Sequence, residues 1–320
     1  MRGERSGVRG TSSRIASERE REANGGGAVA VLLRDSLFGY TQAMTPPALI
    51  CISCNTPAPQ DASFCQNCGS TLTVAPVQEM AAGVPWTLTD IGKAIGVVII
   101  GTIVASVPPT IVAGIIAGSE EIEDDPTALT IALGASIFLE LFLVGTALWF
   151  SVRKYGVPVA SLGLRWPQRG GFWLTVGLTF ALVSGAFTIS YIYFLALDAV
   201  GISPDTDLPE QVYKSAGPLI VLAVLSLVCA PIMEETFFRG FVFGGLRPRW
   251  GAAAAAGASG LLFAVAHIGN PGTIYLIPPV ALIGALFAWG YLVSGSLMAS
   301  ILAHFLFNLV AFTAGFAEFS

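Results

Sequence analysis

The fold is decided by the stretch from Trp250 to Ala317, which reads WGAAAAAGASGLLFAVAHIGNPGTIYLIPPVALIGALFAWGYLVSGSLMASILAHFLFNLVAFTAGFA. This stretch contains no Asp, Glu, Lys or Arg. A soluble domain would not stay in solution with so long a run free of charge. A helix needs about 20 apolar residues to cross the hydrocarbon core of a bilayer, and it satisfies its own backbone hydrogen bonds there. The stretch therefore predicts membrane-spanning helices.

The composition of the whole chain extends this prediction. Of its 320 residues, 54% are hydrophobic and 12% are charged, and the mean hydropathy is +0.72. The charged share is about half of that in a soluble domain. These values exclude a disordered chain, a coiled coil and a basic nucleic-acid binder, and they argue strongly against a soluble enzyme. We expect a multi-pass protein of the cell membrane, with the lipid bilayer as its surroundings and no nucleic acid as a partner.

Seven apolar segments are candidate spans, so the sequence predicts an all-α polytopic membrane protein with a bundle of about seven transmembrane helices. The fifth segment is short, and the fourth is long enough to tilt or bend. The segments are Ile91–Ala117, Thr127–Phe150, Gly171–Leu197, Ala216–Phe243, Ala252–His267, Thr273–Val293 and Leu297–Ala317.

Basic residues in the loops predict the orientation of this bundle. Loops rich in Lys and Arg stay in the cytoplasm. One set of loops carries Arg153, Lys154, Arg165, Arg169, Arg247 and Arg249, and the other set carries Lys214 alone together with many acids. We therefore expect a cytoplasmic N-terminus and, with seven spans, a C-terminus outside.

The chain before the first span divides into three parts by composition. Residues 1–43 hold seven of the sixteen basic residues and are polar and of low complexity, which predicts a disordered tail. A misplaced start, with Met44 as the true one, is the alternative. Residues 44–73 carry a cysteine pattern, residues 74–89 form a linker, and residues 90–320 form the transmembrane domain.

Four cysteines in this segment predict a small zinc ribbon on the cytoplasmic side. They occur as Cys51-Ile-Ser-Cys54 and, ten residues later, Cys65-Gln-Asn-Cys68. Four thiolates close a tetrahedral site around a structural Zn²⁺. Disulfides are less favoured because the cytoplasm is reducing. The segment resembles the small zinc ribbons of many bacterial proteins, and we expect it to serve structure or the binding of a protein partner.

Polar side chains inside the predicted spans are few, and each is a functional candidate because its burial is costly. They are Glu140, Glu234, Glu235, Arg239, His267, His304 and Asn308, and the chain has no other histidine. Glu235 and Arg239 are spaced i,i+4 and can pair, whereas Glu234 is turned about 100° away. His304 and Asn308 have the same i,i+4 spacing, as do Phe263 and His267.

These residue types fit the hydrolysis of an amide without a covalent nucleophile. A carboxylate can act as a general base on water, and a histidine beside it can orient that water. A second histidine and an asparagine amide can donate hydrogen bonds to the oxyanion of a tetrahedral intermediate. Simpler interpretations remain open. The Glu235–Arg239 pair could be structural, the histidines could bridge helices, and Glu140 could serve packing or interior hydrogen bonding. Buried acids also occur in proton or solute transporters.

Three motifs in this order resemble the CPBP intramembrane proteases, which include type II CAAX prenyl endopeptidases and bacteriocin-processing or self-immunity proteins. The motifs are Glu234-Glu235-Thr-Phe-Phe-Arg239, Phe263-Ala-Val-Ala-His267 and His304-Phe-Leu-Phe-Asn308. The resemblance covers residues 90–317, with its core at 216–310. It implies an intramembrane endopeptidase that cleaves membrane-associated proteins or peptides. A non-catalytic immunity or scaffold protein of the same fold is the alternative.

The resemblance also assigns roles to these residues. It implies that Glu234 and His267 activate water, that His304 and Asn308 form the oxyanion hole, and that Glu235 and Arg239, with Phe263 beside them, support the site. Two Glu and two His could ligate a catalytic zinc, but no His-Glu-x-x-His motif is present, so a metal-free reaction is favoured. The predicted span edges place His267 near the outer end of its span, away from His304. For these two residues to share one site, His267 must lie deeper than those edges suggest.

Overall fold

The computed structural model describes residues 49–50, 57–58, 64, 66–69, 83–167, 170–204, 208–268 and 271–319. The chain divides into two compact units, Met1–Gln78 and Glu79–Ser320. In the first unit, strands β1 (Leu49–Ile50) and β2 (Pro57–Ala58) pair antiparallel. Of the four predicted zinc ligands, Cys68 lies in an exposed turn, and the other three lie outside the described residues, as does the predicted tail 1–43. The zinc ribbon therefore stays a prediction.

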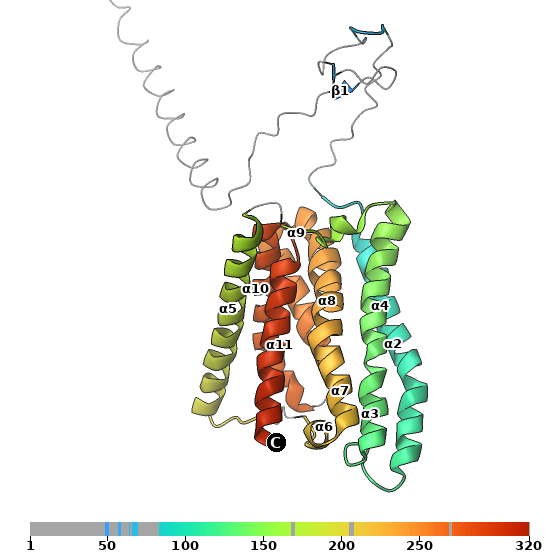
Figure 1. Ribbon diagram of the computed structural model, residues 1–320, viewed down its shortest axis with the longest axis vertical. Helices are drawn as coiled ribbons and strands as arrows, with labels where there is room; N and C mark the ends of the chain where they lie inside the picture. The colour runs from blue at the N-terminus through green and yellow to red at the C-terminus, as the bar shows by residue number, and fades with distance from the viewer. Residues whose placement is uncertain are drawn as a thin grey trace, which may run out of the picture. The chain divides into compact units, whose positions relative to one another are not determined.

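The described part of the second unit is helical, which confirms the predicted fold class (Figure 1). Its α-helices are α2 (Leu88–Ala117), α3 (Pro126–Ala135), α4 (Ile137–Leu148), α5 (Gly171–Ala199), α6 (Gln211–Lys214), α7 (Ala216–Val224), α8 (Ala230–Glu234), α9 (Gly244–Val265), α10 (Ile277–Ser294) and α11 (Met298–Phe319). Three π-helical segments are η1 (Trp149–Arg153), η3 (Leu225–Cys229) and η4 (Glu235–Phe243), and two 3₁₀ turns are η2 (Val159–Leu162) and η5 (Pro271–Leu276).

Among the described residues, six helices are long and apolar enough to cross a membrane. One of them, Ala216–Val265, has 50 residues and covers the fourth predicted span and all but the last two residues of the fifth. Gly251 interrupts it with a φ of 79° and a ψ of 167°, a backbone conformation that a residue with a Cβ rarely adopts. The seven predicted spans therefore correspond to six long helices, one of which is folded into a hairpin.

Contacts across Gly251 show that the two arms of this hairpin run antiparallel. The rings of Phe238 and Phe263 lie 5.3 Å apart, and Glu234 lies 4.0 Å from His267. Both pairs are nearly symmetric in sequence about the turn. The start of α2 and the end of α11 consequently lie at opposite ends of the helix bundle (Figure 1).

Close packing of the second arm depends on small residues. A Cβ on Gly260 would meet the backbone of Ala281 and Ala285, and a Cβ on Gly284 would lie 2.7 Å from the Cα of Gly260. Small residues permit such approach between helices in a membrane, where water supplies no driving force for association. The contact presses α9 against α10 and fixes the depth of the residues at the end of α9.

The π-helical segments release backbone carbonyls for contacts between helices. In η4 the carbonyl oxygen of Phe238 accepts a hydrogen bond from Ser259 Oγ at 2.7 Å, and that of Phe241 accepts one from Trp86 Nε1 at 2.9 Å. Widened turns of this kind interrupt the regular i to i−4 pattern and often occur at functional sites. They are concentrated here in the chain segment that carries Glu234, Glu235 and Arg239.

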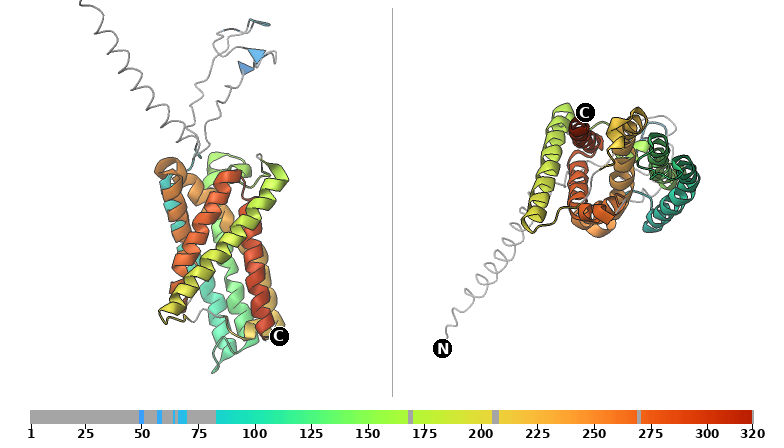
Figure 2. Two further views of the ribbon diagram at one scale, coloured as in Figure 1. Left: turned by 90° about the vertical axis from the view of Figure 1, so that its left-hand side faces the viewer. Right: turned by 90° about the horizontal axis from the view of Figure 1, so that it is seen from below.

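The helices that carry these motifs lie in the middle of the bundle. Viewed along the helices, α2 and α5 lie on opposite flanks, with α11, α10 and the α7–α8 segment between them (Figure 2). The α2 flank is attached through Asp90, which accepts hydrogen bonds from Lys154 at 2.5 Å and from Tyr155 at 2.6 Å. Glu234, Glu235, Arg239 and His304 are buried among these helices, whereas the side chain of His267 is 36% exposed.

Candidate active site

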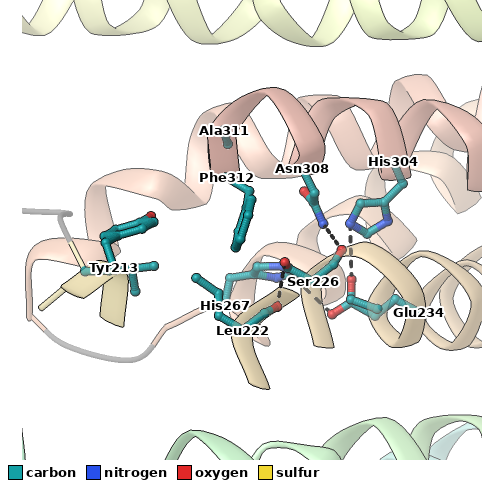
Figure 3. A pocket seen from close by; sticks show the side chains of 11 residues that line it. Tyr213, Leu222, Ser226, Glu234, His267, His304, Asn308, Ala311 and Phe312 are labelled. Atoms are coloured by element: carbon teal, nitrogen blue, oxygen red, sulfur yellow. Dashed lines mark hydrogen bonds and ion pairs between the residues drawn. The ribbon is translucent and has the colours of Figure 1, made fainter. Parts of the chain in front are cut away.

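A cavity of about 300 Å³ lies between α7, α8, α11 and the turn after α9. All four predicted catalytic side chains line it, as does Ser226 of η3 (Figure 3). These four are Glu234, His267, His304 and Asn308. The structure thus brings together residues that are up to 74 positions apart in the sequence, from Glu234 to Asn308.

The ion pair between Glu235 and Arg239 lies beneath this cavity. Oε1 of Glu235 is 2.9 Å from Nη1 of Arg239, and both side chains are fully buried. Arg239 also donates from Nη2 to the carbonyl oxygen of Gly284 at 3.3 Å, and its guanidinium lies 4.2 Å from the ring centroid of Phe263. A buried charge is tolerated when it is paired and hydrogen-bonded. The predicted pairing is present, and Arg239 joins η4 to α10.

His304 joins the ion pair to the neighbouring glutamate. Its Nδ1 is 3.1 Å from Oε1 of Glu235, and its Nε2 is 3.7 Å from Oε2 of Glu234. Because a carboxylate only accepts, Nδ1 carries a proton and donates to Glu235. Nε2 consequently faces Glu234 and the cavity. Sequence spacing alone had placed Glu234 away from Glu235, yet both carboxyls reach the same imidazole.

His267 is oriented by its own helix. Its Nδ1 is 2.8 Å from the carbonyl oxygen of Phe263, so Nδ1 donates and a neutral ring has an unprotonated Nε2. That Nε2 lies 4.0 Å from Oε1 of Glu234, which is too far for a direct hydrogen bond. For a water oxygen about 2.8 Å from each atom, the angle between the two directions would be about 90°, so the water could donate one hydrogen to each. The pair is therefore spaced to hold a water.

The depth of His267 follows from the length of its helix arm. The arm ends at Val265, and His267 lies in the turn that follows. The helical residues from Ala252 to Val265 rise only about 21 Å at 1.5 Å each, less than the hydrocarbon thickness of about 30 Å. The arm therefore ends before it has crossed the hydrocarbon thickness, and this places His267 4.0 Å from Glu234. This explains how His267 and His304 converge although the predicted span edges separated them.

Asn308 lies one turn beyond His304 on α11, as its spacing predicted. Its Nδ2 donates to the carbonyl oxygen of Ser226 at 2.8 Å. The amide nitrogen carries two hydrogens, so this contact orients the group and leaves the second hydrogen for another acceptor. Ser226 belongs to the π-helical segment η3, and no sequence signal had indicated its part in the site.

Glu140 is a further acid, which the sequence assigned to packing or interior hydrogen bonding. It lies on α4 with an exposed fraction of 6%, and its carboxyl interacts with that of Glu234. Among the described residues, its Oε2 has no hydrogen-bond partner. Its lack of an i,i+4 partner had argued against a role, whereas its neighbour is in fact supplied by another helix.

The two Glu and two His of the candidate site are also possible ligands of a metal ion. In the described part of the chain, no three or more His, Cys, Asp and Glu side chains are grouped so that they could hold a metal ion.

Comparison with known proteins gives one match. Residues 216–310 match the family model described as Rce1-like, type II CAAX prenyl endopeptidase Rce1-like. No curated protein and no solved structure matches the chain. The matched residues contain both arms of the Gly251 hairpin and extend past Asn308, so they include all four candidate catalytic residues. The match supports a protease function in general. Over residues 216–310, this membrane protein is therefore similar to the Rce1-like type II CAAX prenyl endopeptidases.

Proposed function

We propose that the protein is an intramembrane endopeptidase that hydrolyses peptide bonds of membrane-associated proteins or peptides. The observation that carries this proposal is the position of Glu234, whose two carboxylate oxygens face His267 at 4.0 Å and His304 at 3.7 Å. A buried acid between two imidazoles, at the inner end of a cavity, is suited to proton transfer with a bound water.

The nucleophile in this proposal is a water held by Glu234 and the unprotonated Nε2 of His267. Glu234 takes one proton from the water as its oxygen attacks the carbonyl carbon of the substrate. The π-electrons of the carbonyl move onto oxygen and form a tetrahedral oxyanion. Because Glu234 then carries a proton, it can deliver that proton to the leaving nitrogen as the C–N bond breaks. Water is consumed, and a carboxylate and an amine are released.

The oxyanion is stabilised by donors from α11. His304 with protons on both nitrogens donates to Glu235 through Nδ1 and presents Nε2–H to the cavity. Asn308 presents the Nδ2 hydrogen that Ser226 does not use. Fixed donors of this kind stabilise charge where it develops and need no reorganisation during the reaction. Glu235 and Arg239 act as positioning residues because they hold His304.

This mechanism uses no catalytic metal, and the following experiment tests it. The protein is purified in detergent and incubated with a diverse peptide pool, and products are identified by mass spectrometry. Wild type and Glu234→Gln are compared with and without a strong chelator. We expect cleavage by wild type in both conditions and none by Glu234→Gln.

Two results would contradict the proposal. Equal cleavage by Glu234→Gln would exclude Glu234 as the base. Loss of wild-type cleavage with chelator would indicate a catalytic metal if a Cys51→Ser/Cys54→Ser variant behaves in the same way, because that variant separates the predicted ribbon from the membrane site.

We also propose that Cys51, Cys54, Cys65 and Cys68 bind one structural Zn²⁺ and that the ribbon serves a protein partner. Their two Cys-x-x-Cys pairs support this. Elemental analysis of the purified protein should give one zinc per chain, and Cys51→Ser/Cys54→Ser should lower this content. A wild-type protein without zinc would exclude the ribbon.

A further inference from the structure

The cavity extends from the catalytic cluster toward one end of the bundle only. Its lining continues from Glu234 and His304 to Tyr213 on α6 and Phe312 near the end of α11 (Figure 3). Leu208, in the segment before α6, completes this side and is 40% exposed. Helix α6 and the end of α11 lie at the same end of the bundle (Figure 1). We call this the α6 end.

Contacts between loops define the opposite end. Arg165 donates from Nε to the carbonyl oxygen of Gly295 at 2.9 Å, which joins the segment before α5 to the turn between α10 and α11. Lys154, just after η1, pairs with Asp90 in the first turn of α2. The Gly251 turn lies at this end as well, since its arms run from α7 at the α6 end. None of these segments lines the cavity.

Basic residues are distributed unequally between the two ends. The end opposite α6 carries Arg153, Lys154, Arg165, Arg247 and Arg249. At the α6 end, Lys214 is the one basic side chain among the described loop and helix-end residues, and it is paired with Glu210. The loop between α2 and α3 at this end carries acids instead, at Glu120, Glu121, Glu123, Asp124 and Asp125.

This distribution of basic residues predicts the orientation of the protein in the membrane. Short loops rich in Lys and Arg remain in the cytoplasm, and the count of basic residues decides the orientation more than net charge does. The five basic residues against one therefore place the end opposite α6 in the cytoplasm. The cavity, which extends the other way, then opens on the non-cytoplasmic side.

We infer that the cavity is entered from the non-cytoplasmic face, so that its substrates are exported, membrane-anchored polypeptides cleaved in the outer half of the bilayer. The substrate part of this inference rests on the proposed peptidase function, whereas the orientation does not. A protein lipidated in the cytoplasm and held on the inner leaflet would meet the closed end of the bundle. The apolar side chains of Leu208, Tyr213 and Phe312 favour a hydrophobic stretch next to the cleaved bond.

Cysteine labelling in intact cells tests the orientation. The full-length chain is expressed with one added cysteine, as Ser203→Cys or Leu208→Cys near the cavity entrance, or as Val159→Cys at the opposite end. Ser203 and Val159 are exposed and lie outside the long helices. Cells are treated with a membrane-impermeant maleimide. Mass spectrometry of the labelled peptides then separates the added cysteine from Cys229 and the four N-terminal cysteines.

We expect labelling of Ser203→Cys and Leu208→Cys in intact cells, and labelling of Val159→Cys only after the cells are broken. Labelling of Val159→Cys in intact cells, or protection of Ser203→Cys there, would overturn the inference. Leu208→Cys reports the entrance itself, and Ser203→Cys keeps the test valid if Leu208→Cys does not fold.

A cleavage assay on the same membranes separates this inference from the proposed function. An externally added impermeant maleimide should lower the rate of cleavage by Leu208→Cys at least tenfold. It should leave the rate of cleavage by Val159→Cys unchanged. Unchanged cleavage by labelled Leu208→Cys would overturn entry from this face. Labelling as expected without cleavage in any sample would instead contradict the peptidase function, because labelling requires no catalysis.

Discussion

Oε1 of Glu235 lies 3.1 Å from Nδ1 of His304 and also forms an ion pair with Nη1 of Arg239 at 2.9 Å. One buried carboxylate oxygen therefore links the ion pair of the hairpin to the imidazole of α11. The contact fixes both the proton position and the orientation of His304. Because Glu234 and Glu235 are adjacent, the same link sets the position of the proposed base relative to the proposed oxyanion donors.

Replacing the proposed base should remove activity without unfolding the protein. Glu234→Gln keeps the side-chain volume but cannot take a proton, and general-base catalysis is worth about 10²- to 10⁴-fold. We expect kcat to fall by at least about 100-fold, measured on any peptide that the wild type cleaves. The melting temperature in detergent should remain within a few degrees of wild type. A variant that retains wild-type kcat would show that another group activates the water.

Removing the Asn308 amide should affect the transition state more than substrate binding. Loss of one oxyanion donor costs about 10²- to 10³-fold in kcat. Asn308→Ala should therefore lower kcat by that factor while KM changes little. Thr313→Ala is the matched control because Thr313 lies on the same helix, is exposed, and bonds only to backbone of its own turn. Equal losses in the two variants would attribute the effect to the helix and not to the donor.

Breaking the buried ion pair should destabilise the fold. Arg239→Met leaves Glu235 buried without its partner, and loss of one member of such a pair costs about 3–5 kcal/mol. The double variant Glu235→Gln/Arg239→Met should recover part of this, since neither charge remains. Chemical unfolding in detergent measures both.

The comparison pair for this experiment is Lys214 with Glu210, which is about half exposed. Lys214→Met should cost less than about 1 kcal/mol because water screens an exposed pair. If Arg239→Met were as mild as Lys214→Met, the Glu235–Arg239 pair would not support the site.

A methyl group added at the contact between α9 and α10 should displace Arg239 and so disturb the candidate active site. The Cβ of Gly284→Ala would lie 2.7 Å from the Cα of Gly260 and 3.2 Å from Nη2 of Arg239. Overpacking of this kind costs about 1–3 kcal/mol, and the shift of Arg239 should also lower kcat. Gly257→Ala is the matched control, since nothing lies within 4 Å of its added Cβ. Measurements of the melting temperature and of the cleavage rate should separate Gly284→Ala, which lowers both, from Gly257→Ala, which changes neither.

The ion pair between Lys154 and Asp90, which joins α2 to the end of the second span, should be lost in alkali. The hydrogen bond from Lys154 to Asp90 raises the pKa of Lys154 above its usual 10.5. A raised lysine pKa contributes stability below the unfolded pKa, and that stability disappears as the pH rises through the folded pKa. The difference in stability between wild type and Lys154→Met should therefore be constant from neutral pH to about pH 10 and shrink above it. A difference that vanished near neutral pH would exclude this pair as its source.

The sequence by itself determined the features that depend on local spacing. The uncharged stretch Trp250–Ala317 predicted membrane helices because the bilayer core excludes charge. The i,i+4 spacing predicted the Glu235–Arg239 pair and the common face of His304 and Asn308, since residues one turn apart on a helix are neighbours whatever surrounds them. The motif order also predicted which segments belong to one site.

Only the tertiary structure decided how these faces meet. The hairpin at Gly251 brings Glu234 to within 4.0 Å of His267. On the α11 side, Ser226 of η3 accepts a hydrogen bond from Asn308, and Glu235 at the start of η4 contacts His304. Glu140 acquires its neighbour from another helix, and the cavity extends toward one end because the second arm of the hairpin is too short to span the bundle. Such features arise from contacts between helices, which set depth and rotation. A helical repeat along one segment contains no information about either.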